Sequence, residues 1–74
     1  MEERVFSRFQ SVMDIPPEMS KAEIIYNDTP GWDSVAHMTL IGALEDEFDC
    51  MLEMDDIIEM SSFEMAVVIM NKYV

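Results

Sequence analysis

The sequence is poor in basic residues, with 4 Lys and Arg against 16 Asp and Glu over 74 residues, so its net charge is −12. A surface of this sign repels nucleic-acid phosphates and anionic lipid headgroups and attracts basic protein surfaces. We therefore expect no nucleic-acid partner and favour proteins with basic faces.

Cysteine and long apolar runs are scarce as well. The single cysteine, Cys50, cannot form an internal disulfide. No apolar stretch approaches the roughly 18 residues that a membrane span needs, and no segment has the basic start, apolar run and cleavage site of a secretory signal. The expectation is a cytoplasmic monomer with no membrane span.

Groups suited to catalysis or metal binding are few. His37 is the only histidine, and no second base, activated nucleophile or metal-ligand cluster accompanies it. A chain of this length buries only about 60% of the surface that its unfolded form exposes, so a deep cleft would remove packing that it needs. The sequence predicts one domain, residues 1–74, with no catalytic residue and no bound metal.

Helical periodicity begins close to the N-terminus. It predicts a helix from Glu2 to Met13, which Pro16 and Pro17 end because proline lacks an amide proton and disfavours helix in the preceding residue. From there to Asp33, turn residues and weak periodicity predict a long ordered loop with one short helical turn near residues 21–25. The predicted core residues of the first helix are Val5, Phe9, Val12 and Met13.

Three further helices are predicted after this loop. Ser34 is the expected N-cap of a helix that runs to Phe48, because its oxygen can accept a hydrogen bond from an unpaired amide of the first turn. A short helix over residues 55–60 and a last helix after a capping box of Ser61 and Glu64 complete the pattern. Their predicted core residues are Leu40, Ile41, Leu44, Phe48, Ile57, Met60, Phe63, Ala66, Val67 and Met70.

The fold class that follows is all-α. We expect a small four-helix bundle with three longer helices, a short third helix and a long loop between the first and second helices.

Two short motifs resemble those of a known family. Residues 31–35 read GWDSV and residues 44–48 read LEDEF, which is similar to the acyl carrier proteins, where Gly-x-Asp-Ser-Leu opens a helix that ends in Leu-Glu-x-x-Phe. The resemblance extends over nearly the whole chain. It implies that a phosphopantetheinyl transferase moves 4′-phosphopantetheine from coenzyme A to Ser34, and that the terminal thiol then carries acyl groups as thioesters. It also implies that Asp33, the acid next to the modified serine and its transferase, belongs to the cofactor-binding site, with a plain turn residue as the alternative.

The chain also departs from this family in its second helix. Carriers of fatty-acid synthesis usually have acids early in that helix, whereas this chain has Ala36 and Thr39 there, and it has Gly42 where a large apolar residue is common. The acidic charge instead lies at residues 45–47. A specialised lipid, polyketide or aminoacyl pathway is therefore at least as well supported as fatty-acid biosynthesis, and an aminoacyl or peptidyl carrier is the alternative.

A docking surface is expected on the same helix. At 100° per residue, Val35 and Met38 lie beside the core stripe, and Glu45 and Asp46 extend that side. The apolar pair would give affinity, and the acids would steer acyl-loading and acyl-transfer enzymes that have basic docking surfaces. The alternative is that the loop covers the apolar pair and that the acids are an ordinary solvated face.

Several other residues have both a structural and a functional interpretation. His37 is expected on the core-facing side as a hydrogen-bonded structural residue, with contact to the arm or its cargo as the alternative. Trp32 either covers the bundle edge or is exposed for recognition, and Cys50 is expected to be a packing residue. The 9 methionines suit a core that adapts to a changing cavity, and the five of most interest are Met38, Met54, Met60, Met65 and Met70.

Two rival functions share these features. A calcium-sensor lobe is also small, acidic and rich in methionine, but the candidate loops place Pro30, Phe48 or Met51 where oxygen ligands are required. The other rival is an acidic interaction domain that is never modified and in which Ser34 is only a helix cap.

Overall fold

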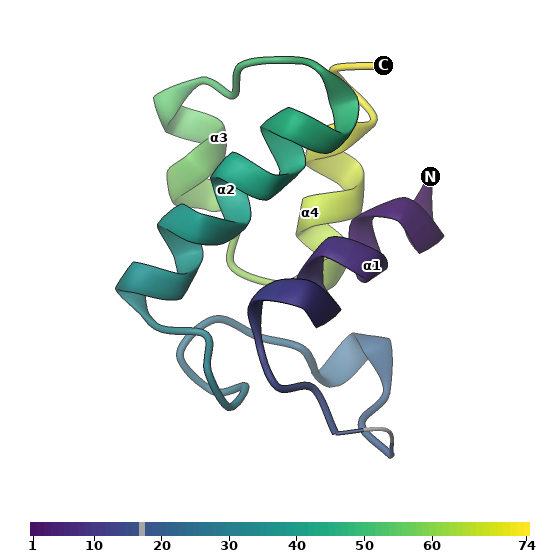
Figure 1. Cartoon of the computed structure of the whole chain (residues 1–74), viewed down its shortest axis with the longest axis vertical. Coiled ribbons are helices and arrows are strands. Elements are labelled where there is room, and N and C mark those ends of the chain that lie inside the picture. The colour runs from purple at the N-terminus through teal and green to yellow at the C-terminus, as the bar shows by residue number, and fades with distance from the viewer. Residues whose placement is uncertain (17) are drawn as a thin grey trace.

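The computed structural model describes residues 1–16 and 18–74. Within these residues the elements are α1 (Glu2–Val12), the 3-10 helix η1 (Lys21–Glu23), α2 (Ser34–Phe48), α3 (Met54–Glu59) and α4 (Phe63–Met70). The predicted all-α bundle, with its short third helix and long first connection, is confirmed. In the view of Figure 1, α2 lies between α1 and α3, and the long connection closes one end of the bundle.

The core collects buried apolar side chains from α1, α2, α4 and the connections, and Ile57 of α3 packs against it partly buried. Phe9 of α1 makes edge-to-face contacts with Trp32 and with Phe63 of α4, with ring centroids 5.1 and 5.2 Å apart. Most predicted core residues are buried, although Val12, Phe48, Ile57 and Val67 are only partly so. The buried core residues are Val5, Phe9, Met13, Ile24, Trp32, Leu40, Ile41, Leu44, Leu52, Met60, Phe63, Ala66, Ile69 and Met70.

The first helix ends one residue earlier than predicted. Met13 has extended backbone angles and is the C-cap of α1, with its side chain buried. The helix therefore ends before it reaches Pro16. Pro17, which was also expected to end the helix, lies outside the described residues.

Two predicted helix caps are wrong by one residue. Asp33, and not Ser34, is the N-cap of α2, and its Oδ1 accepts a hydrogen bond of 2.9 Å from the amide of Ala36. Likewise Ser62 caps α4 through a 3.0 Å bond from the amide of Met65, so the predicted box of Ser61 with Glu64 does not form. In both places the capping residue is the one with extended backbone angles, which lets its side chain fold back over the first turn.

The short helix α3 is anchored to the C-terminal segment by the buried carboxylate of Asp56. Asp56 is 6% exposed and accepts hydrogen bonds from the ammonium of Lys72 and the hydroxyl of Tyr73. The same hydroxyl accepts a 3.0 Å bond from the amide of Glu53. The Lys72 ammonium and the Tyr73 hydroxyl lower the pKa of Asp56, and Asp56 in turn raises the pKa of both partners.

This carboxylate predicts a pH-dependent contribution to stability. Because the pKa of Asp56 is lower in the folded state, its stabilisation is present above the unfolded value, near pH 4, and is lost as the pH falls through the folded value. Asp56→Asn should therefore lower the free energy of unfolding most at neutral pH, and its difference from wild type should shrink below about pH 4. Urea unfolding across this pH range measures the difference, and a constant gap would contradict the prediction.

None of the helices among the described residues is long and apolar enough to cross a bilayer.

Candidate functional site

The turn before α2 depends on a glycine. Gly31 has φ +86°, a conformation that residues with a side chain rarely adopt, and a Cβ there would lie 3.4 Å from the Cβ of Met13. The next residue, Trp32, turns inward and is 1% exposed. The glycine of the motif thus brings the loop against the end of α1 and allows the indole to enter the core.

Ser34 lies at the surface as the first residue of α2. Its hydroxyl makes no hydrogen bond to a described residue, and neither do the backbone amides of Ser34 and Val35. The next two amides, those of Ala36 and His37, donate to the side-chain and backbone oxygens of Asp33. An exposed hydroxyl thus lies beside two free amides at the positive end of a helix dipole. These are the donors that a phosphate group requires.

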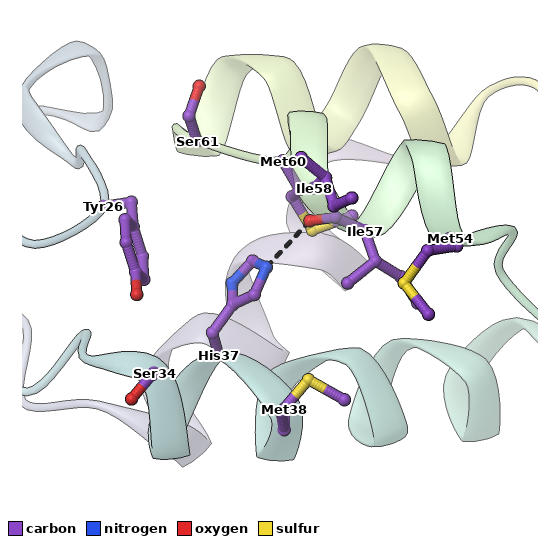
Figure 2. A pocket seen from close by; sticks show the side chains of 9 residues that line it. All are labelled: Tyr26, Ser34, His37, Met38, Met54, Ile57, Ile58, Met60 and Ser61. Atoms are coloured by element: carbon purple, nitrogen blue, oxygen red, sulfur yellow. Dashed lines mark hydrogen bonds between the residues drawn. The ribbon is translucent and has the colours of Figure 1, made fainter.

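An apolar cavity of about 380 Å³ opens beside Ser34. Figure 2 shows that Met38 of α2 and Met54 of α3 point toward each other across this space, while Tyr26 approaches from the connection before α2. No Asp, Glu, Lys or Arg is among the lining residues, which are Tyr26, Ser34, His37, Met38, Met54, Ile57, Ile58, Met60 and Ser61. The volume falls within the range of small-molecule sites in proteins.

His37 extends from α2 into the lining of this cavity. Its Nδ1 accepts a 3.0 Å hydrogen bond from the indole of Trp32, and its Nε2 lies 2.9 Å from the carbonyl oxygen of Ile57 in α3. The predicted structural role, partly buried and hydrogen-bonded, is what the structure shows. His37 also lines the cavity, so contact with a cargo remains a second role that this geometry permits.

The apolar pair that the sequence placed on the docking surface is open to solvent. Val35 is 75% and Met38 is 60% exposed, so the loop does not cover them. One turn beyond Met38, Gly42 faces open space, and apart from its chain neighbours and the nearby backbone of its own helix, no described atom lies within 4 Å of the position a Cβ would take. Asp46, one turn further, is exposed and makes no hydrogen bond or ion pair to a described residue.

The other two acids of this segment have structural partners. Glu45 accepts a 2.9 Å hydrogen bond from the amide of Leu52 and so holds the connection to α3. Glu47 pairs with Arg4 and Arg8 at 2.8 and 2.9 Å and so links α2 to α1. Hydrogen bonds from these two guanidinium groups lower the pKa of Glu47. Of the three acids in the 45–47 segment, only Glu47 is thus paired with cations, and Asp46 is the one whose side chain has no partner among the described residues.

Sequence reasoning missed the contribution of α3 and of the loop to the site. Tyr26, Ile57 and Ile58 line the cavity, yet none of them was singled out as a site residue. The signal available was the run of Met54, Ile57 and Ile58, which gives a short helix more large apolar side chains than one core-facing stripe requires.

The methionines and the cysteine divide among different environments. Met38, Met54 and Met60 line the cavity, whereas Met70 is buried in the core and Met65 is 40% exposed. Cys50 is partly buried against the core, and burial, together with the carboxylates of Glu45 and Asp49, raises its thiol pKa. Among the described residues, no cluster of three His, Cys, Asp or Glu side chains is placed to hold a metal ion.

Comparison with known proteins adds one finding. A family model described as a phosphopantetheine attachment site matches residues 3–67, which include the Gly31 turn, Ser34 and every residue that lines the cavity. No curated protein and no solved structure matches the chain.

Proposed function

Because the chain belongs to the phosphopantetheine attachment site family, we propose that Ser34 is the residue that bears the group. Members of this family hold 4′-phosphopantetheine covalently, so the chain is a phosphopantetheine-carrying carrier protein. Carrier domains of this kind are generally non-catalytic and work with a phosphopantetheinyl transferase and with acyl-handling enzymes. The terminal thiol of the bound group forms thioesters with the cargo.

The surroundings of Ser34 carry the attachment proposal. Its hydroxyl is exposed and unbonded within the described chain, and the free amides of Ser34 and Val35 can receive the phosphate oxygens. Asp33 contributes as the cap that fixes where α2 begins. The bond from the amide of Ala36 holds this carboxylate against the first turn of α2.

The cavity supports an acyl rather than an aminoacyl cargo. Five of its nine lining residues are methionine or isoleucine, from α2, α3 and the residue that follows α3, so a hydrocarbon chain gains from entering it. No carboxylate is among the lining residues, and an ammonium group taken inside would lose its water without gaining an opposite charge. The proposed function is therefore acyl carriage in a specialised lipid, polyketide or related pathway.

A matched pair of cargoes tests this preference. The transferase can load Ser34 from acetyl, hexanoyl or 2-aminohexanoyl coenzyme A, and the last two differ only by the amine. Hexanoyl should raise the thermal midpoint above that of the acetyl form by about 4–8 °C, which corresponds to roughly 1 kcal/mol in a domain of this size. The aminoacyl form should show a smaller rise. Equal midpoints for all three forms would contradict an internal acyl site.

Docking is proposed on the exposed face of α2. Val35 and Met38 supply apolar area next to Ser34, and Asp46 supplies a free acid two turns further along. A partner with an apolar contact surface and a nearby basic side chain would fit both features. Glu45 is held by Leu52, so its contribution to docking is proposed to be secondary.

Two substitutions test this surface. Met38→Ala and Asp46→Lys should each lower kcat/KM for phosphopantetheine transfer several-fold, and the effect of Asp46→Lys should weaken as salt rises, because screening reduces steering. Glu18→Lys is the control, since it makes the same charge change at an exposed position in the loop after α1. Equal rates for all variants, with circular dichroism confirming the fold, would place recognition elsewhere.

A further inference from the structure

His37 has a fixed hydrogen-bonding state. The indole N–H of Trp32 can only donate, so the Nδ1 of His37 must accept, and the proton of the neutral ring is on Nε2. That proton is donated to the carbonyl oxygen of Ile57. Both ring nitrogens are thus used, and together they orient the ring.

The bond to Ile57 joins the two walls of the cavity. Helix α3 ends at Glu59, and the amide of Ser61 bonds instead to the carbonyl of Glu59, so the carbonyl of Ile57 lacks the usual partner four residues later. The side chain of His37 supplies that partner from α2, 2.9 Å away. Figure 2 shows the imidazole rising from α2 to this carbonyl, with Met38 and Met54 on one side of it and Tyr26 on the other.

Aromatic rings of the core lie directly behind His37. The imidazole stacks on Trp32 with centroids 5.9 Å apart and planes at 26°, and Trp32 in turn contacts Phe9. Neither Trp32 nor Phe9 lines the cavity. The imidazole therefore lies between the cavity and the aromatic core, as does Tyr26, which also lines the cavity and contacts Trp32 with ring centroids 5.7 Å apart.

We propose that His37 is the specificity-determining residue that sets the inner limit of the cavity, and with it the longest acyl chain that the protein shelters. This inference rests on the proposed acyl-carrier function. A chain that enters beside Ser34 can extend along Met38, Met54 and Ile58, but it meets the imidazole before it reaches Trp32. Passing further would break the bond to Ile57 and leave its carbonyl oxygen without a partner, which is costly for a partly buried group.

The test is a chain-length series in three proteins. Wild type, His37→Ala and His37→Gln are loaded with acetyl, butyryl, hexanoyl, octanoyl and decanoyl groups, and each thermal midpoint is compared with that of the acetyl form of the same protein. In wild type the midpoint should rise and then level off within the series. In His37→Ala the midpoint should keep rising to a longer chain before it levels off, by at least one two-carbon step of the series. His37→Gln should level off where wild type does, because its amide fills similar space and can still donate to Ile57.

A second readout applies to wild type alone, so that the inference does not depend on the variants folding. Nuclear Overhauser contacts from the terminal methyl of the longest bound chain should reach Met38, Met54 or Ile58 and should not reach the rings of Trp32 or Phe9. A contact with either ring in wild type, or the same length limit in His37→Ala, would overturn the proposal for His37. If no chain raises the wild-type midpoint, the cavity shelters no acyl chain and the proposal for His37 fails with it, whereas attachment of the group at Ser34 is judged separately by intact mass.

Discussion

Ser34→Ala is expected to abolish phosphopantetheine attachment while leaving the free energy of unfolding within about 0.5 kcal/mol of wild type. The physical reason is that the hydroxyl of Ser34 is the proposed nucleophile toward coenzyme A, yet it bonds to no described residue and caps no helix. Intact-mass analysis after incubation with coenzyme A and a broad-specificity transferase measures the first effect, and urea unfolding measures the second.

The neighbouring residue provides the matched control. Asp33→Ala removes the cap of α2 and should cost about 1 kcal/mol of stability, whereas Asp33→Asn can still accept the bond from Ala36 and should cost less. Asp33→Ala should still gain the mass of one phosphopantetheine group when it is folded. A Ser34→Ala protein that is modified as fully as wild type would end the assignment of Ser34.

Trp32→Ala is expected to have the largest effect on stability. The indole is 1% exposed, contacts the rings of Phe9 and Tyr26 edge-on, and donates to His37. Truncating a buried ring of this size costs about 3–5 kcal/mol, and at about 4–8 °C per kcal/mol for a domain of this size the thermal midpoint should fall by at least about 12 °C. Thermal melting followed by circular dichroism measures the fall.

Trp32→Phe separates packing from hydrogen bonding. Phenylalanine keeps much of the aromatic contact but removes the indole N–H, which leaves the Nδ1 of His37 without its donor. We expect a smaller loss than in Trp32→Ala. A Trp32→Ala variant that melts within a few degrees of wild type would show that the loop is held in place by other contacts.

Periodicity predicted the helices well because their apolar residues repeat at the spacing that packing requires. Helix α2 ends at Phe48 as expected, and Leu40, Ile41 and Leu44 are buried in it. The caps were missed because Asp33 and Ser34, like Ser61 and Ser62, are adjacent residues that can both cap a helix. Which of them does so depends on the path by which the chain enters the helix, and tertiary contacts set that path.

The walls of the site were less predictable than its attachment residue. The motif around Ser34 is local in sequence, whereas the cavity joins Tyr26, Met38 and Ile58 from three separate segments. The bond from His37 to Ile57 spans 20 residues and depends on α3 ending where it does. The partner of Glu45 was also not predictable from the sequence. Its position on the helix predicts an exposed acid, but the hydrogen bond that it accepts from the amide of Leu52 depends on how the connection after α2 folds back.

The most direct test of the central claim is peptide mapping of the wild-type protein after reaction with coenzyme A and a broad-specificity phosphopantetheinyl transferase. We expect that one phosphopantetheine group is added, that the added mass lies on the peptide containing Ser34, and that fragmentation assigns it to that hydroxyl. A protein that stays unmodified under conditions in which a known carrier is fully converted, or a group found on any other residue, would contradict that claim.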